Sequence, residues 1–324
     1  MTASRDRATR NGAGEGPVFH IGLPKTGTTF LQERFFPRLG IPFHTTHRRA
    51  LPRSLSWVYR VNGRWIDPRL PRIARRAMLA AIASREVQPA PELLDGPALV
   101  SAEGLCGVSH DPLLNSSAIA RALASAHPNA RIVICVRGHA DWCESVYRQL
   151  VLREDRFGAF VPFDRFFSAG QRIDATTHVR DLRWSDLCRT WQSAFGKDHV
   201  LILRYEWLRD DPPRFLGRLA RFILGSERTP GLPAMDRVNE TASVSDYRGT
   251  PAVRTVGRLL RSLVAGNKAR AEHEFWAMTS AMRAGAHPPA FPGIDAKTRL
   301  RIDERALEDE MQLRQMLGEA TVPK

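Results

Sequence analysis

The chain has 324 residues, of which 43% are hydrophobic and 25% are charged, as in an ordinary soluble globular enzyme. Lysine and arginine outnumber acidic residues by 48 to 34, and a net charge of +14 favours anionic partners such as nucleic acid, acidic glycan, phospholipid or a charged nucleotide. No apolar stretch reaches the roughly 18 uninterrupted residues of a membrane span. Residues 1–16 are polar and no apolar segment follows them, which predicts a flexible tail rather than a signal peptide, and a cytoplasmic protein.

The cysteines show no pattern typical of a disulfide framework or a metal site. They form no C-x-x-C pair and no Cys/His cluster at zinc spacing, so we expect reduced, metal-free thiols. The four positions are Cys106, Cys135, Cys143 and Cys188.

The first predicted unit is a strand at 17–22, a turn rich in Gly, Lys and Thr, and a helix at 28–36. Backbone N–H groups at the start of a helix lack intrahelical partners and carry partial positive charge. The turn is therefore expected to bind a phosphate or sulfate group.

This turn is not the loop of a nucleotide-hydrolysing P-loop protein. Counting G-x-x-x-x-G from Gly22 reaches Gly27, where such a loop continues with Lys and then Ser or Thr. Here Thr28 and Thr29 follow, and the only lysine of the loop is Lys25. A cation at that place approaches the anion from the strand side, which favours a donor other than ATP.

The segment Pro24-Lys-Thr-Gly-Thr-Thr29 resembles the 5′-phosphosulfate-binding loop of sulfotransferases that use 3′-phosphoadenosine 5′-phosphosulfate (PAPS). The resemblance implies a bacterial-type sulfotransferase with PAPS as donor, adenosine 3′,5′-bisphosphate (PAP) as product and no metal. It also implies that Lys25 stabilises the leaving oxygen and contacts the donor. The other donor-binding residues of the loop are then Thr26, Gly27, Thr28, Thr29 and Phe30.

Strands are next predicted at 40–44 and 97–102, with a helix at 71–86 between them. Glu103 follows the later strand, in a Ser-x-Glu arrangement that resembles several bacterial and Golgi-type members of the family, some of which use glutamate as the base. A helix-start or salt-bridge role for this carboxylate is the alternative. His44 and His47, after the earlier strand, are rival bases.

A strand at 130–136 and a helix at 140–153 repeat the strand–turn–helix pattern. Arg137 ends the strand, and Ser145 is expected about one turn inside the helix, so that both side chains converge on one oxyanion. The pair resembles the family's 3′-phosphate motif. The stretch 154–180 holds several phenylalanines among Gly, Pro and Arg, and it either walls an acceptor pocket or is a packed connecting segment.

A helix at 181–195 and a strand at 199–204 complete the pattern, and Tyr205 follows. The family resemblance implies that this tyrosine contacts the adenosine of the donor, and the alternative is a core aromatic residue at a strand end. From about 213 the chain is mostly helical in pattern, with an amphipathic basic segment at 253–264 that we expect to pack on the protein itself, and a charged helix at 299–317. The closing motif of the cytosolic sulfotransferases is absent.

The alternation of strands and helices predicts an α/β fold with three αβα layers, a central parallel sheet of about five strands like that of P-loop NTPases, and a helical C-terminal part. A single domain is expected over 17–324. Ligands of such folds bind beyond the carboxyl ends of the strands, where Lys25, Glu103, Arg137 and Tyr205 are all expected. The expected acceptor is a hydroxylated small molecule, carbohydrate or lipid, or an amine, with no specific nucleic-acid partner.

Two other classes of function compete with this one. A P-loop kinase or NTPase shares the topology but requires a Gly-Lys-Ser/Thr run and a magnesium-binding aspartate, and neither is present at these positions. A non-catalytic basic protein that binds polyanions requires aromatic residues interleaved with the charges on one face, and no such stripe is seen.

Overall fold

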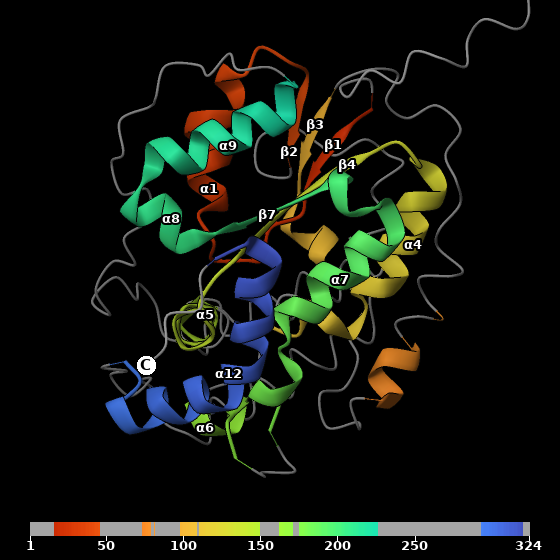
Figure 1. Ribbon diagram of the computed structural model, residues 1–324. Helices are drawn as coiled ribbons and strands as arrows, with labels where there is room; N and C mark the ends of the chain where they lie inside the picture. The colour runs from red at the N-terminus through yellow and green to blue at the C-terminus, as the bar shows by residue number, and fades with distance from the viewer. Residues whose placement is uncertain are drawn as a thin grey trace, which may run out of the picture.

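The structure, a computed structural model, describes residues 16–45, 73–78, 81, 98–108, 110–149, 162–170, 175–225 and 293–319. Its centre is a sheet of five parallel strands in the order β2-β3-β1-β4-β7 (Figure 1). The predicted number of strands and their parallel direction are thereby confirmed. The strands are β1 (Val18–His20), β2 (Phe43–Thr45), β3 (Leu99–Ser101), β4 (Arg131–Val136) and β7 (Val200–Arg204).

Alternate residues of the strands face two separate hydrophobic clusters, because successive side chains of a strand point to opposite faces of the sheet. In β4, Val133 and Cys135 belong to one cluster, while Ile132 and Ile134 belong to the other. All six residues of β4 are buried, as in a parallel sheet covered by helices on both faces. The three predicted layers are therefore present.

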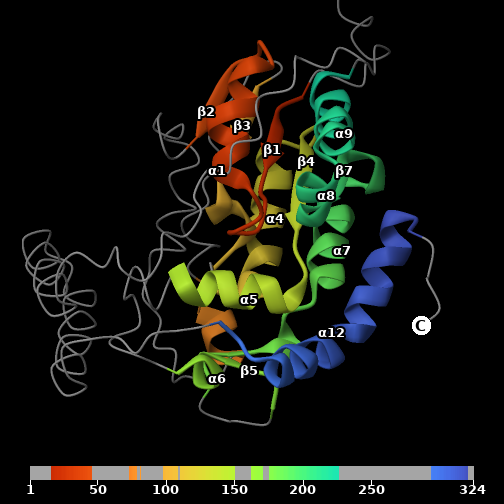
Figure 2. The ribbon, with the colours of Figure 1, turned by 90° about the vertical axis from the view of Figure 1, so that its left-hand side faces the viewer.

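One face of the sheet is covered by the helices that follow β1 and β7, and the other face by α4 and α7 (Figures 1 and 2). Beyond the carboxyl ends of the strands lie α5 and α12 (Figure 2). The helices of the first face are α1 (Thr28–Phe30) with its continuations η1 (Leu31–Phe35) and η2 (Phe36–Arg38), α8 (Tyr205–Asp210) and α9 (Pro212–Leu224). The others are α4 (Ser116–Ala126), α5 (His139–Tyr147), α7 (Trp184–Phe195) and α12 (Ala296–Leu317).

Local sequence signals explain where α9 and α12 begin and end. The Asp211 side chain accepts a hydrogen bond from Arg214 N at the start of α9, and the Asp295 side chain accepts one from Thr298 N at the start of α12. Both helices stop at a glycine in the left-handed conformation, Gly225 and Gly318. Among the described residues, no helix combines the length and the apolar character needed to cross a membrane.

Two predicted helices differ from those in the structure. The helix expected at 28–36 opens with only three α-helical residues and continues as a π-helix over Leu31–Phe35. The helix expected from 140 begins at His139, so Ser145 lies nearly two turns inside it rather than one. The helices at 116–126 and 181–195 that the same apolar spacing predicts from the sequence correspond closely to α4 and α7.

The aromatic segment at 154–180 is described in part, as α6 (Phe163–Phe166), β5 (Phe167–Ser168) and β6 (Thr177–His178). Phe166 and Phe167 are buried, and their rings contact Tyr147 and Trp142 respectively. This part of the segment is therefore packed into the core, as the second sequence interpretation has it. Short connecting helices complete the described fold: η4 (Glu103–Cys106), η5 (Pro112–Leu114), η7 (Val179–Asp181) and η8 (Lys197–His199).

Several sequence predictions fall outside the described residues. They concern the tail before residue 16, the amphipathic segment at 253–264, and the rival base His47. Of the helix predicted at 71–86, residues 73–78 and 81 are described and are helical.

Candidate active site

The loop between β1 and α1 is anchored to the neighbouring strand and to the helix after it. Leu23 N donates to Cys135 O of β4 at 3.1 Å, and the indole N–H of Trp142 on α5 donates to Pro24 O at 2.9 Å. Inside the loop, the Thr26 hydroxyl donates to Leu23 O at 2.6 Å. These bonds hold the loop in one shape at the carboxyl edge of the sheet.

Two residues of the loop have left-handed backbone conformations. Lys25 has a φ of 68°, the only positive φ among the described residues that are not glycine, and Gly27 has a φ of 83°. A Cβ atom at Gly27 would lie 2.7 Å from Leu208 Cδ2 and 3.4 Å from the Tyr205 ring, so this place requires glycine for space as well as for conformation. The sharp turn brings the N–H groups of Thr28 and Thr29 to the start of the helix.

The loop contains a buried polar atom that has no partner in the described part of the chain. Thr28 is only 3% exposed, yet its hydroxyl makes no hydrogen bond there. Buried hydroxyls are normally hydrogen-bonded, because an unmade bond costs about 1–3 kcal/mol. An anion seated on the loop would accept a hydrogen bond from this hydroxyl, and the residues present therefore fit such a group.

Arg137, at the end of β4, points toward this loop. Its Nη1 donates to Lys25 O at 2.9 Å, and its guanidinium carbon lies 4.7 Å from the centre of the Tyr205 ring. Its Nε is buried without a hydrogen-bond partner among the described residues. The structure thus brings together three of the residues predicted from sequence: Lys25, Arg137 and Tyr205.

Tyr205 is the first residue of α8, and the residue after it fixes α8 against the turn that follows Arg137. Glu206 Oε1 accepts a hydrogen bond from Gly138 N at 2.9 Å. Its other oxygen lies 3.6 Å from Arg204 Nε, which is close enough for an ion pair but too long for a hydrogen bond. Sequence reasoning missed Glu206, although its position directly after the candidate tyrosine was a usable signal.

Glu103 and Ser145 occupy the surroundings of this group. Glu103 is half-buried and begins η4 directly after β3, which neighbours β1 on the side opposite β4. Glu103 and Arg137 therefore follow the two strands that flank β1 and its loop. Ser145 is half-buried on α5, and no hydrogen bond joins it to Arg137 in the described structure. Its convergence with Arg137 on one oxyanion stays a prediction. His44 lies in β2 at the edge of the sheet.

A buried polar cluster, which sequence reasoning also missed, lies beneath the loop. His20 Nδ1 and Ser101 Oγ are 2.8 Å apart, and the Gln32 amide donates to Ser101 Oγ at 2.9 Å. Burial lowers the pKa of His20 from 6.5 to about 3, so its ring is neutral in the folded protein. Polar residues inside otherwise apolar strands, as in Val-Phe-His and Leu-Val-Ser, were the signal for this cluster.

Comparisons with known proteins point to one family. The model of a family described as the sulfotransferase family matches residues 17–228, more than half of the chain. No curated protein matches the sequence significantly.

Two similar solved structures are both sulfotransferases. One, from Alicyclobacillus acidocaldarius, is 15% identical with a TM-score of 0.43, over 79% of this chain and 93% of that chain. The other is mouse SULT7A1 in complex with PAP, which is 13% identical with a TM-score of 0.39, over 94% of this chain and 89% of that chain.

Proposed function

Since this chain belongs to the sulfotransferase family, we propose that it transfers a sulfuryl group from PAPS to an acceptor hydroxyl or amine. The observation that carries the proposal is the loop at 24–29, where the buried Thr28 hydroxyl has no partner among the described residues and Arg137 contacts Lys25. A basic residue on each side of one nucleotide suits a donor that carries phosphate groups at both its 5′ and 3′ positions.

The loop residues bind the 5′ end of the donor in this proposal. The N–H groups at the start of α1 and the hydroxyls of Thr28 and Thr29 surround the 5′-phosphate. Thr26, whose hydroxyl donates to Leu23 O, completes the loop together with Gly27 and Phe30. The Lys25 ammonium group neutralises charge on the oxygen that leaves sulfur. No other described residue of the loop carries a positive charge.

Residues after β4 and β7 bind the rest of the nucleotide. The Nε edge of the Arg137 guanidinium faces the 3′-phosphate, while its Nη1 stays on the loop carbonyl. Ser145 contributes its hydroxyl to binding of the same phosphate, and Tyr205 contacts the adenosine.

When bound, PAPS supplies a sulfuryl group whose bond to the 5′-phosphate oxygen breaks as the acceptor oxygen bonds to sulfur. Glu103 accepts the proton that the acceptor hydroxyl loses. Positioning of the two reactants and neutralisation of charge provide most of the rate in reactions of this type.

Thermal stability in the presence of nucleotides tests the proposal. PAP at a hundred times its dissociation constant should stabilise the fold by about 2.7 kcal/mol, because only the folded protein binds it. AMP, and ATP with magnesium, should give clearly smaller shifts at the same concentration. Equal shifts with PAP and AMP would remove the 3′-phosphate assignment, and a larger shift with ATP and magnesium would favour the kinase or NTPase alternative.

The Arg137→Ala variant tests which residue binds the 3′-phosphate. The control for a lost positive charge is Arg121→Ala, at an exposed position on α4. The Arg137 variant should lose most of the advantage of PAP over AMP, whereas the control should keep it.

A further inference from the structure

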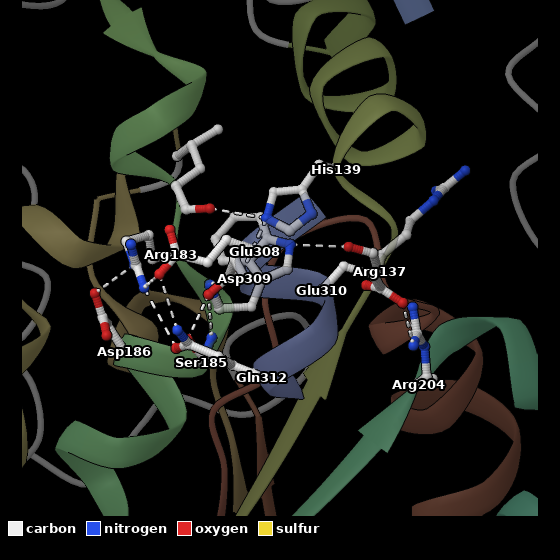
Figure 3. Close-up of polar contacts among 12 residues, drawn as sticks. Arg137, His139, Arg183, Ser185, Asp186, Arg204, Glu308, Asp309, Glu310 and Gln312 are labelled. Atoms are coloured by element: carbon white, nitrogen blue, oxygen red, sulfur yellow. Dashed lines mark hydrogen bonds and ion pairs between the residues drawn. The ribbon is translucent and has the colours of Figure 1, made fainter. Parts of the chain in front are cut away.

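The helix α12 lies outside the matched range 17–228, yet it contacts α7 and α5 beside Arg137, and Arg204, which directly precedes Tyr205. Figure 3 shows Asp309 and Glu310 of this helix together with Arg137 and Arg204. We propose that Asp309 and Glu310 of α12 are positioning residues of the donor site, which hold Arg137 and this tyrosine in place for a nucleotide with a 3′-phosphate. The proposal rests on the proposed function, because it concerns the same site.

Asp309 reaches Arg137 through the first residue of α7. Its carboxylate is 4% exposed and accepts hydrogen bonds from Trp184 N at 2.7 Å and Ser185 N at 3.0 Å, which are donors of the first turn of α7. The indole N–H of the same Trp184 donates to Arg137 O at 3.0 Å. One tryptophan therefore links Asp309 to the backbone of the candidate phosphate-binding arginine.

A second route runs through His139, the first residue of α5. His139 Nε2 lies 2.8 Å from Leu182 O and 3.3 Å from Asp309 Oδ2. A carbonyl oxygen can only accept, so Nε2 carries the hydrogen and donates it to Leu182 O, with Asp309 Oδ2 beside the same nitrogen. The His139 ring also stacks on Trp184, with ring centres 5.0 Å apart. Asp309 thus fixes Trp184, which donates a hydrogen bond to Arg137 O, and His139, which lies two positions after Arg137.

Glu310 acts on the other side of the site, through Arg204. Its Oε1 accepts a hydrogen bond from Arg204 Nη1 at 2.6 Å, and a second one from Arg314 at 3.0 Å. Arg204 is the last residue of β7 and directly precedes Tyr205, and its side chain is only 12% exposed. Holding this side chain fixes the end of β7, and with it the place where the Tyr205 ring lies beneath the Arg137 guanidinium.

Adjacent residues of an α-helix point about 100° apart, which explains how one helix can contact residues near the ends of both β4 and β7. Asp309 faces α7 and α5, while Glu310 faces the end of β7. The apolar side of the helix fixes its position, because Ile302 and Leu313 are buried in the same cluster as Trp184. The spacing between the arginine and the tyrosine is therefore set by a third, rigid element.

The test measures the affinities for PAP and for AMP in folded variants by calorimetry. Glu310→Gln and Asp309→Asn keep the shape of each side chain, and Glu304→Gln, exposed on the same helix, is the matched control for a lost negative charge. We expect at least a fivefold fall in the ratio of PAP affinity to AMP affinity for Glu310→Gln and for Asp309→Asn, and no change for Glu304→Gln. A merely structural role would lower the melting temperature and leave this ratio unchanged.

The outcomes separate the two proposals. If the unsubstituted protein does not prefer PAP to AMP, the proposed function fails, and the positioning role falls with it. If the unsubstituted protein prefers PAP and folded Glu310→Gln keeps the full preference, the positioning role alone is overturned. Should Asp309→Asn fail to fold, Glu310→Gln decides the question, because its side chain is less buried.

Discussion

Lys25 combines a charged side chain with a strained backbone. Its φ of 68° lies in the left-handed region, which costs a residue other than glycine about 1 kcal/mol. Glycine is the usual residue at such positions, so the presence of a lysine here is explained if its ammonium group is needed. Backbone strain of this kind concentrates at sites of function.

Substitutions at Lys25 can separate the two effects. Lys25→Gly and Lys25→Ala should both abolish sulfuryl transfer, because both remove the ammonium group, while the glycine variant should be about 1 kcal/mol more stable than the alanine variant. Denaturant unfolding and a turnover assay check this, with the exposed Lys197→Ala as the control. Turnover retained in either variant would remove the lysine from the mechanism.

We propose Glu103 as the base because it follows β3, on the side of the loop opposite Arg137. Glu103→Gln should lower turnover by about 10² to 10⁴, the usual range for a general base, and leave the affinity for PAP nearly unchanged. Steady-state kinetics and calorimetry on the same sample measure both quantities. Undiminished sulfation in this variant would transfer the role to His44 or His47.

His20 predicts a pH dependence of stability. Its pKa is about 3 in the folded protein because of burial, against 6.5 for an ordinary histidine. Below pH 6.5 the unfolded chain therefore binds a proton that the folded protein does not, so this residue destabilises the fold increasingly as the pH falls toward 3. The loss is about 1.4 kcal/mol one unit below 6.5.

His20→Gln should flatten the stability profile between pH 6.5 and 4, as measured by denaturant unfolding at a series of pH values. The exposed His199→Gln serves as the control and should leave the profile unchanged. A profile for His20→Gln as steep as that of the unsubstituted protein would contradict the burial argument.

At the scale of the elements, the helix that follows the loop shows the limit of reasoning from sequence. Its apolar spacing predicts an α-helix over 28–36, but the structure has a π-helix over Leu31–Phe35. The Gln32 side chain in that stretch donates to Ser101 of β3, a partner 69 positions along the chain. Such a distant partner leaves no trace in local spacing, whereas α4, with its own complete apolar periodicity, was predictable to within a residue or two.

The acidic residues of α12 also carry a prediction about folding stability. Burial by itself raises the pKa of Asp309, but hydrogen bonds with His139 and Ser185 outweigh it and lower the pKa below the ordinary value of 3.8. For Glu310, burial is likewise outweighed by the hydrogen bond and charge of Arg204, and the pKa falls below 4.5. Both groups therefore stabilise the fold fully above about pH 4.5, and this stabilisation is lost as the pH falls through the lowered values.

Asp309→Ala should reduce the free energy of unfolding at pH 7 by about 2–3 kcal/mol, because it leaves the first N–H groups of α7 buried without their acceptor. Acid below pH 4 should destabilise this variant less than the unsubstituted protein, since one of the groups that must be protonated is gone. Equilibrium unfolding at pH 7 and at pH 3.5 measures both effects. A loss below about 0.5 kcal/mol at pH 7 would show that water replaces the carboxylate.

For the whole molecule, the sequence predicted which strand ends meet but not what holds them there. Lys25, Arg137 and Tyr205 follow three neighbouring strands, and the rule that parallel strands present their carboxyl ends at one edge was sufficient to group them. The contacts of α12 join residues more than 100 positions apart, such as Arg204 and Glu310. Pattern reasoning predicts that such a helix exists, but no periodicity indicates what it contacts.

This placement of α12 has a consequence for synthesis of the protein on the ribosome. The strands and the loop emerge from the exit tunnel before Asp309 and Glu310, which follow all five described strands of the sheet in the sequence. A nascent chain that lacks these two residues contains the loop, but its arginine and tyrosine are not yet held in place. The capacity to distinguish nucleotides is therefore expected to arise only after α12 has been synthesised.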